Sequence, residues 1–279
     1  MNVLHCGQYR LPLEKPLVMG IVNLTPDSFS GDGLIGDVQG AIAHARAQFE
    51  AGAEILDIGA ESTRPGALAT PEDEELRRLL PVLKEITTWG VPISIDTYKP
   101  AVMRAALDAG ATMINDISGM VHPEALAAVA ASDCAVCTMH MQGQPGTMQQ
   151  SPYYTDVVAE VRAFLHDSVE RCRRAGVEDA RIILDPGFGF GKTLEHNLAL
   201  FAALTATGFD NLPILVGVSR KTMIGAITGR SVEQRMPGSV AAALIAAQKG
   251  AKILRVHDVA ATKDALAVWR AIEMGGCSD

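Results

Sequence analysis

Short runs of consecutive apolar residues recur along the chain, and a polar or charged residue follows each run. Continuous rather than alternating apolarity is typical of strands that are buried on both faces of a sheet. The runs therefore predict eight buried strands, at residues 18–22, 54–58, 92–95, 112–114, 135–139, 181–184, 214–218 and 252–254.

Segments with helical periodicity separate these runs. We expect helices at residues 37–50, 71–88, 100–109, 123–131, 155–175, 194–207, 238–248 and 259–272. The second begins at Thr70-Pro71, which offers an N-cap residue and a proline at the first helical position. Five helical segments are followed by glycines that are expected to end them, namely Gly52, Gly90, Gly110, Gly176 and Gly250.

The order of these elements predicts the fold class. Eight strand–helix units without a linker or a change in composition indicate an α/β fold, a single (β/α)₈ TIM barrel in which residues 1–279 form one domain. An amphipathic segment at residues 3–13 is expected to form a short β-hairpin that covers one end. An open, doubly wound sheet is the alternative, but no unit carries the G-x-G-x-x-G turn of a dinucleotide-binding fold.

Charge and cysteine content narrow the choice of partners and compartment. The net charge of −8 argues against broad affinity for nucleic acid or membrane surfaces, so we expect neither as a partner. The five cysteines lack the spacing of a disulfide framework. Cys134 and Cys137 form a C-x-x-C inside an apolar run, where buried free thiols in a reducing cytoplasm are favoured over a redox or metal site.

Polar groups that could carry chemistry follow nearly every expected strand. In a TIM barrel the carboxyl ends of the strands face one mouth, where catalytic groups gather. A purely structural barrel would not need such groups at nearly every strand end. In chain order they are Asn23, Glu61, Ser62, Thr63, Arg64, Asp96, Asn115, Asp116, His140, Asp185, Ser219, Arg220, Lys221, Arg255 and His257.

These strand-end groups are of two chemical types. Asp96, Asn115 and Asp185 can accept hydrogen bonds from the N–H and amino groups of a flat heterocycle. The second type is rich in donors and suits a phosphate or diphosphate, which barrels often bind after strands seven and eight. It comprises Arg64, Lys221, Arg255 and His257, with Asn23 opposite. A diphosphate would bring Mg²⁺, to which Asn23 could supply one oxygen.

Other positions admit two interpretations. Asp57 could act in the site or be a satisfied carboxylate inside the barrel, and His140 could contact ligand or support a neighbour. Met139 is expected to line the pocket or the core.

The stretch Gly187–Thr193 resembles a phosphate-binding P-loop but has one residue too few between its glycine and G-K-T. Its glycines instead suit close approach to a flat ligand, with Phe188 or Phe190 beside the ring.

Beyond these chemical arguments, the chain resembles the dihydropteroate synthase family of bacterial folate biosynthesis over nearly its whole length. The motifs that carry the resemblance are VMGIVNLTPDSFS, LDIGAESTRPG, ISIDT, INDISG, MHMQGQPGTMQ, LDPGFGFGK, LVGVSRKTMIG and RVHDV. The first two motifs, DPGFGFGK and SRK are highly specific in combination. The chain departs from the family pattern F-S-D-G-G at Phe29-Ser30-Gly31-Asp32-Gly33, where the carboxylate lies one position later.

The resemblance implies a transferase that joins 4-aminobenzoate to 6-hydroxymethyl-7,8-dihydropterin diphosphate, giving 7,8-dihydropteroate and diphosphate. It also implies Mg²⁺ as cofactor, with Asn23 as its ligand, and a homodimer. The residues implied to bind the pterin are Asp96, Asn115, Asp185 and Lys221. Those implied for the diphosphate are Asn23, Thr63, Arg64, Arg255 and His257. Those implied for 4-aminobenzoate are Phe29, Pro65, Lys221 and Thr222. Met139, Phe190 and Val256 are also expected among the substrate-binding residues. The catalytic set is Lys221, Arg255, His257 and Asp96.

Three other functions fit the sequence less well. A pterin-binding methyltransferase would not need the S-T-R-P-G and S-R-K motifs. A non-catalytic pterin-binding homologue would be expected to lack Asn23, Arg64, Lys221 or His257, all of which are present. A Schiff-base aldolase using Lys221 does not suit the neighbouring Arg220 or the cations expected for a diphosphate.

Overall fold

The computed structural model describes residues 2–24, 38–62, 69–273 and 275. The expected site residues Phe29, Thr63, Arg64 and Pro65 lie outside the described residues, and so does Asp32.

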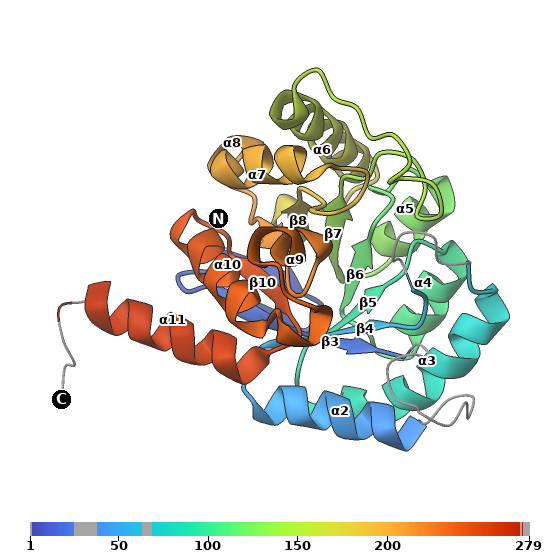
Figure 1. The fold of residues 1–279 in the computed structure, drawn as a ribbon. Coiled ribbons are helices and arrows are strands. Elements are labelled where there is room, and N and C mark those ends of the chain that lie inside the picture. Colours follow the sequence, from blue (N-terminus) through green and yellow to red (C-terminus); the bar gives the residue numbers. More distant parts are fainter. Residues whose placement is uncertain (1, 25–37, 63–68, 274, 276–279) are drawn as a thin grey trace.

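Eight parallel strands form the barrel, at all eight positions predicted from the sequence (Figure 1). Their order around the sheet is β8-β7-β6-β5-β4-β3-β10-β9. The ring closes between its two ends, because Leu184 bridges Ile214 in parallel and the Leu184 N–H donates to the Pro213 carbonyl at 2.9 Å. The prediction of a TIM barrel is confirmed, and the open sheet is excluded. The strands are β3 (Leu17–Asn23), β4 (Ile55–Gly59), β5 (Ile93–Asp96), β6 (Met113–Asp116), β7 (Ala135–Met139), β8 (Ile182–Asp185), β9 (Leu215–Val216) and β10 (Ile253–Val256).

Helices surround the strands on the outside of the barrel (Figure 1). They are α2 (Val38–Glu50), α3 (Glu72–Ile86), α4 (Pro100–Asp108), α5 (Pro123–Ala130), α6 (Val157–Arg174), α7 (Leu194–Ala202), α8 (Leu204–Thr207), α9 (Thr222–Thr228), α10 (Met236–Gln248) and α11 (Val259–Glu273). Two features differ from the prediction. The segment 194–207 forms two helices rather than one, and α9 was not predicted at all.

The glycine signals at helix ends are confirmed, whereas the expected cap at Thr70 is wrong. All five predicted C-terminal glycines have a positive φ. At the start of α3, however, Pro71 occupies the N-cap position and no side chain caps the helix. The backbone of Thr70 is held elsewhere: its N–H donates to Glu61 Oε1 at 2.9 Å, and its carbonyl accepts from Lys99 Nζ at 2.5 Å.

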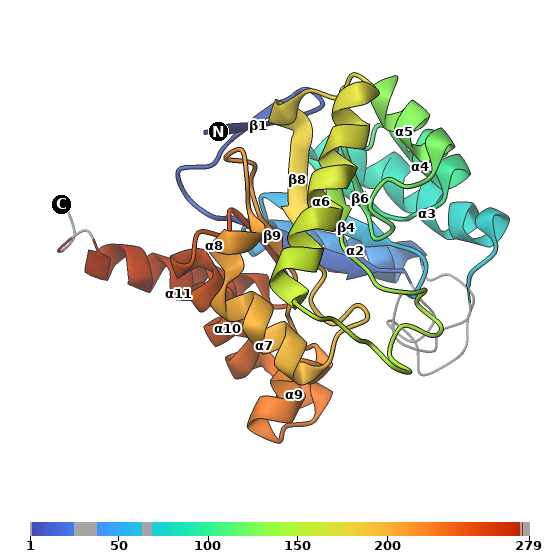
Figure 2. The same cartoon turned by 90° about the horizontal axis from the view of Figure 1, so that it is seen from above.

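The N-terminal segment forms the expected hairpin, with β1 (Val3–Cys6) antiparallel to β2 (Tyr9–Pro12). It lies at the end of the barrel where the strands begin, opposite α9 (Figure 2). Leu4 and Cys6 are fully buried and pack in one cluster with interior barrel residues such as Met19 and Ile55. The hairpin thereby closes the barrel floor and leaves the carboxyl ends of the strands as the mouth.

The described cysteines are buried free thiols. Burial raises the pKa of both Cys134 and Cys137, which keeps the C-x-x-C pair neutral. The structure therefore supports the sequence-based choice of core thiols over a redox or metal pair.

Candidate active site

Strand register brings predicted site residues from neighbouring strands into one layer at the mouth. Asn23 of β3 pairs with Gly59 of β4, Gly59 pairs with Asp96 of β5, and Asp96 pairs with Asn115 of β6. Gly59 leaves the space between its neighbours open: a Cβ built there would lie 3.6 Å from Asn23 Oδ1 and 3.5 Å from Asp96 Cβ. The side chains of Asn23 and Asp96 therefore face the same space.

Arg255 on β10 joins two carboxylates across this layer. Its Nε donates to Asp57 Oδ2 at 2.6 Å, and its terminal nitrogen donates to Asp96 Oδ2 at 2.7 Å. Asp57 is completely buried and also accepts from the Ser94 hydroxyl at 2.6 Å, while Asn115 Nδ2 lies 3.5 Å from both Asp57 oxygens. Asp57 is thus a satisfied interior carboxylate that orients Arg255, one of the two roles considered for it.

Asp96 keeps one buried oxygen without a partner. Burial raises the pKa of Asp96, an effect that the adjacent Arg255 charge opposes. Its Oδ2 is used by Arg255, whereas Oδ1 is inaccessible to solvent and has no hydrogen-bond partner among the residues that the structure describes. Because buried polar atoms are nearly always paired in native proteins, the free oxygen indicates a position where a ligand donor completes the site.

Asp185 and Lys221 extend the mouth on the other side. Asp185 Oδ1 accepts from the Gly187 N–H at 2.7 Å. Lys221 Nζ donates to the Phe188 carbonyl at 2.5 Å and lies 4.6 Å from the centre of the Phe190 ring. Burial raises the pKa of Asp185 and lowers that of Lys221 to about 8, and each charge opposes the shift of the other. The two residues therefore carry complementary charges beside an aromatic face.

The remaining expected site residues occupy different environments. His257 follows β10, and its Nδ1 lies 3.1 Å from the Ser219 hydroxyl, which also accepts from the His257 backbone N–H. Thr222 is exposed at the start of α9. Met139 is buried in the barrel, whereas Val256 is buried in the outer apolar core. Val256 could thus reach a ligand only through its backbone.

Gly187 is placed so that no other residue fits. Its φ is +70°, and a Cβ there would lie 1.8 Å from the His140 carbonyl oxygen. We expect Gly187→Ala to lower the free energy of unfolding by about 2–4 kcal/mol, because both backbone strain and a clash are introduced.

Gly176→Ala provides the matched control for denaturant titration. Gly176 also has a left-handed φ, of +91°, but no atom lies within 4 Å of a Cβ built there. Its substitution should cost only the backbone strain, about 1 kcal/mol. Equal losses in the two variants would contradict the close approach of Gly187 to His140.

The sequence interpretation missed a buried ion-pair network just beyond the carboxyl ends of β4 and β5. Lys99 Nζ donates to Glu61 Oε2 at 2.6 Å and to Glu75 Oε2 at 2.7 Å. Glu75 belongs to the acidic first turn of α3, where an exposed side chain is expected from the sequence, but it is only 1% exposed. Burial raises the pKa of Glu75, against the hydrogen bond from Lys99. A run of four consecutive acidic residues at a helix start does not reveal which side chain points inward.

A second contact missed from the sequence joins the loops after β9 and β10. Arg220 has a left-handed φ of 56°, uncommon for a residue with a side chain. Its guanidinium pairs with both oxygens of Asp258, at 3.0 and 2.5 Å. Lys221 and His257 each adjoin one member of this pair, so the ion pair fixes the two loops relative to each other.

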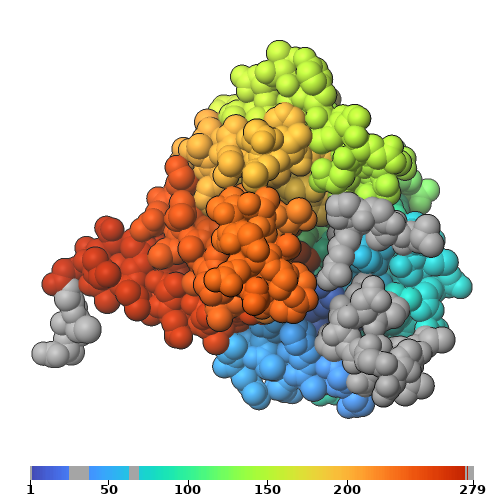
Figure 3. Space-filling model, viewed as in Figure 1, coloured from blue at the N-terminus to red at the C-terminus, as the bar shows by residue number. Residues whose placement is uncertain are grey.

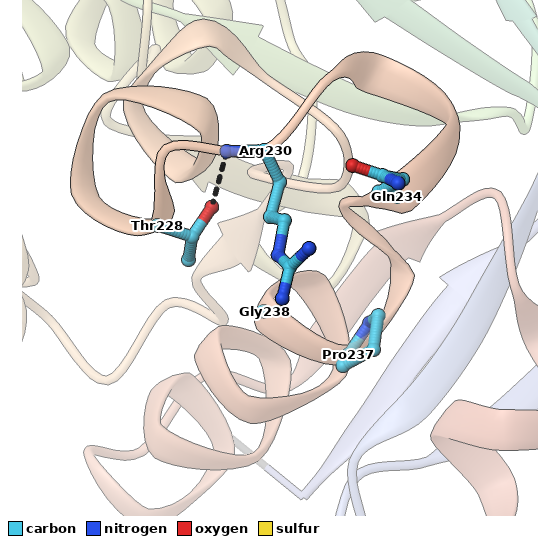
Figure 4. Close-up of a pocket in the computed structure, with 5 residues that line it drawn as sticks. All are labelled: Thr228, Arg230, Gln234, Pro237 and Gly238. Atoms are coloured by element: carbon cyan, nitrogen blue, oxygen red, sulfur yellow. Dashed lines mark hydrogen bonds between the residues drawn. The ribbon is translucent and has the colours of Figure 1, made fainter.

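A hollow of about 270 Å³ lies away from these residues, between α9 and the start of α10 (Figure 4). The Thr228 hydroxyl accepts from the Arg230 N–H at 3.3 Å, and the Arg230 side chain extends across the hollow. The residues that line the hollow are Thr228, Arg230, Gln234, Pro237 and Gly238. Arg230 is the one charged residue among them, and none belongs to the predicted site.

The side-chain oxygens at the mouth suit a metal ion that is bound mainly by substrate and water and only in part by the protein. Within the described ranges, no group of three or more His, Cys, Asp or Glu side chains could hold a metal ion. Asn23 offers an amide oxygen beside Asp96. Mg²⁺ commonly takes one or two protein oxygens and completes its shell with phosphate and water, so these residues fit a diphosphate-borne Mg²⁺ rather than a site built wholly of protein.

The chain matches a known protein family over most of its length. The model of the pterin binding enzyme family matches residues 19–257. Dihydropteroate synthase of Escherichia coli K12 is 48% identical over 262 residues, which cover 94% of this chain and 93% of the relative. The chain therefore belongs to the pterin-binding enzymes and, within them, to the dihydropteroate synthase family.

Two solved structures agree with this assignment. Burkholderia cenocepacia dihydropteroate synthase complexed with 7,8-dihydropteroate is 50% identical, with a TM-score of 0.90 and coverage of 98% of this chain and 96% of that one. Xanthomonas albilineans dihydropteroate synthase with 4-aminobenzoic acid is 51% identical, with a TM-score of 0.92 and coverage of 98% of each chain. The family resemblance seen in the sequence motifs is confirmed.

Proposed function

We propose that this chain condenses 6-hydroxymethyl-7,8-dihydropterin diphosphate with 4-aminobenzoate to form 7,8-dihydropteroate and diphosphate. The observation that carries the proposal is the buried Asp96 Oδ1, which has no hydrogen-bond partner among the described residues. It lies in one layer with Asn115 and close to the charge of Lys221, which in turn lies close to Asp185. A pterin ring presents N–H and amino donors to such acceptors. The complexes of two relatives with 7,8-dihydropteroate and 4-aminobenzoic acid support the same chemistry.

In the proposed reaction, Asp96, Asn115, Asp185 and Lys221 hold the pterin, with the ring of Phe190 beside it. Met139 lies behind them, in the barrel interior. The diphosphate lies toward Asn23, Arg255 and His257, where positive charge and N–H donors can stabilise the charge of the departing group. The set for 4-aminobenzoate is Lys221 and the exposed Thr222, with Phe29 and Pro65 outside the described residues.

The bond changes need little from the protein beyond binding and electrostatics. The C–O bond to the diphosphate breaks, and the diphosphate leaves with the electron pair. The amine nitrogen of 4-aminobenzoate then bonds to the exocyclic carbon of the pterin and releases one proton. Arg255 and His257 act on the leaving group, while Asp96 and Lys221 hold the ring. No strong base is required, because the attacking amine is neutral.

We propose that Mg²⁺ accompanies the diphosphate and takes the Asn23 side-chain oxygen as a protein ligand. The metal would neutralise charge on the diphosphate oxygens. Asn23→Ala should raise the Mg²⁺ concentration needed for half-maximal rate, which a Mg²⁺ titration at fixed substrates would measure. An unchanged Mg²⁺ requirement would remove Asn23 from this role.

Diphosphate release by the purified full chain tests the proposed function. Release is expected only when the pterin substrate, 4-aminobenzoate and Mg²⁺ are all present. Binding of the pterin without turnover would favour a non-catalytic pterin-binding protein. Trapping of a substrate on Lys221 by borohydride would favour the Schiff-base alternative.

We propose that a second copy of this chain covers exposed apolar side chains on the last two helices. Helix α11 projects from the rest of the molecule (Figure 3) and exposes Val268 and Ile272, at 60% and 73%. Ile245 on the adjacent α10 is 44% exposed. Clustered exposed apolar side chains are typical of protein interfaces. Analytical ultracentrifugation should show a dimer that Ile272→Asp converts to monomer, and a monomeric parent protein would refute the proposal.

We also propose that residues 1–279 form one domain and that the protein is cytoplasmic. The buried free thiols of the described cysteines support a reducing compartment. Within the part of the chain that the structure describes, no helix is long and apolar enough to cross a membrane.

A further inference from the structure

The lysine of the glycine-rich stretch that resembles a P-loop is turned into the protein. Lys192 is 3% exposed. Its Nζ donates to the Gly187 carbonyl at 2.8 Å and to the Phe190 carbonyl at 3.0 Å, and it lies 2.9 Å from His140 Nδ1. An ammonium group has three N–H donors, which these three acceptors match. A fourth acceptor, the His140 carbonyl, lies farther from Nζ, at 3.4 Å. Lys192 is therefore fully engaged by protein groups.

The pKa shifts of Lys192 and His140 favour one arrangement of the protons between these two side chains. Burial lowers the pKa of Lys192 to about 7, and Asp185 opposes the shift. Burial and the neighbouring Lys192 lower the pKa of His140 to about 3, so the His140 ring stays neutral. Its Nδ1 can then accept from the ammonium group, which places the ring hydrogen on Nε2.

The turn that Lys192 closes contacts two members of the proposed pterin site, Asp185 and Lys221, and contains a third, Phe190. Within it, the Gly187 N–H donates to Asp185 and the Phe188 carbonyl accepts from Lys221. The Phe190 ring packs against the Lys221 ammonium group. Lys192 binds the carbonyls of the first and last residues of this four-residue turn, so its contacts set the positions of the atoms between them.

We propose that Lys192 is a positioning residue: by closing the turn at residues 187–190, it holds Asp185, Lys221 and Phe190 in the geometry that binds the pterin. The inference rests on the proposed function and assigns Lys192 no contact with substrate. It also accounts for His140, whose side chain serves as the third acceptor for Lys192 rather than as a ligand group.

Steady-state kinetics of Lys192→Met test this role. Methionine keeps an apolar side chain in place but leaves three buried acceptors without a donor, and the turn relaxes. We expect the KM for the pterin substrate to rise about tenfold or more, while the KM for 4-aminobenzoate changes by less than about twofold. Lys192→Gln, which keeps two N–H donors, should lie between Lys192→Met and the parent protein.

Lys249→Met is the matched control. Lys249 Nζ donates to the single carbonyl of Ala202, and Lys249 lies just before β10, at the opposite end of the barrel from the mouth. This variant should leave both KM values unchanged. A lower fraction of active enzyme with an unchanged pterin KM in Lys192→Met would reduce Lys192 to a folding role and overturn the inference.

Calorimetric titration of the pterin substrate tests the role of Lys192 independently of the proposed function. It measures the pterin affinity of the parent protein and of both Lys192 variants, whether or not turnover occurs. Weaker pterin binding by Lys192→Gln and Lys192→Met supports the inference even if the parent protein forms no product, which would refute only the proposed function. Equal affinity in all three proteins overturns the role of Lys192.

Discussion

Arg255→Met is expected to abolish turnover and to lower the free energy of unfolding by about 3–5 kcal/mol. Arg255 binds Asp57 and Asp96 at once, and Asp57 is completely buried. Removing the guanidinium leaves the buried carboxylate of Asp57 and the largely buried carboxylate of Asp96 without their counter-ion. Removing one partner of a buried ion pair costs more than the pair contributes, because the charge that remains is no longer compensated.

Two further variants, compared by denaturant titration, separate the loss of the buried counter-ion from the mere loss of an arginine side chain. Arg162→Met removes a surface guanidinium that caps the carbonyls of Ala206 and Gly208 and should cost less than about 1 kcal/mol. The double variant Asp57→Asn/Arg255→Met should recover part of the stability and none of the turnover. A loss of stability in Arg255→Met no greater than in Arg162→Met would contradict the central ion-pair arrangement.

Asp185→Asn is expected to raise the KM for the pterin substrate about 100-fold without lowering stability. The amide keeps the shape of the side chain and can still accept from the Gly187 N–H. It removes the charge that would pair with pterin donors and with Lys221. Because burial raises the pKa of Asp185, its charge is costly in the folded protein, and neutralising it should leave the free energy of unfolding equal or higher.

Asp167→Asn is the control for this prediction, measured by steady-state kinetics and thermal unfolding. Asp167 is 77% exposed on the outer helix α6 and should tolerate the change in both measurements. A pterin KM for Asp185→Asn within about twofold of the parent value would remove Asp185 from the binding set.

The barrel could be predicted from the sequence because its strands are buried on both faces. Every residue of β4, β7 and β8 is buried, so the apolar runs mark these strands without ambiguity. Helix α9 was missed because its seven residues, which follow the polar groups after β9, are too few to show a helical period. The local pattern of apolar and polar residues therefore predicts buried strands and their ends better than it predicts short helices in the connections.

The gathering of these residues at the barrel mouth was predictable, whereas the contacts between them were not; their roles in binding stay a prediction. Strand ends identified Asp96, Asn115, Asp185 and Arg255, because parallel strands bring their carboxyl ends to one mouth. The pairing of Arg255 with Asp57 and Asp96 spans 198 and 159 residues, respectively, and joins the two chemical sets that the sequence suggested were separate. Such contacts depend on barrel closure, which no local pattern encodes.

Lys192 shows why a motif alone can mislead. Its G-K-T context suggests a phosphate ligand, but the turn directs the ammonium group toward the His140 side chain and two carbonyls. The positive φ values of Gly187, Gly189 and Gly191 produce this turn. The altered glycine–aspartate order at Gly31-Asp32 lies outside the described residues, and a contribution of Asp32 to the site stays a prediction.

The stoichiometry of product formation by the purified full chain shows whether the barrel mouth is the site of condensation. With both substrates and Mg²⁺, mass spectrometry should detect 7,8-dihydropteroate, and one diphosphate should be released for each product molecule. Asp185→Asn at the same low pterin concentration should form little of either. Diphosphate release that does not depend on 4-aminobenzoate, or undiminished product from Asp185→Asn, would contradict the assignment of this mouth as the site of condensation.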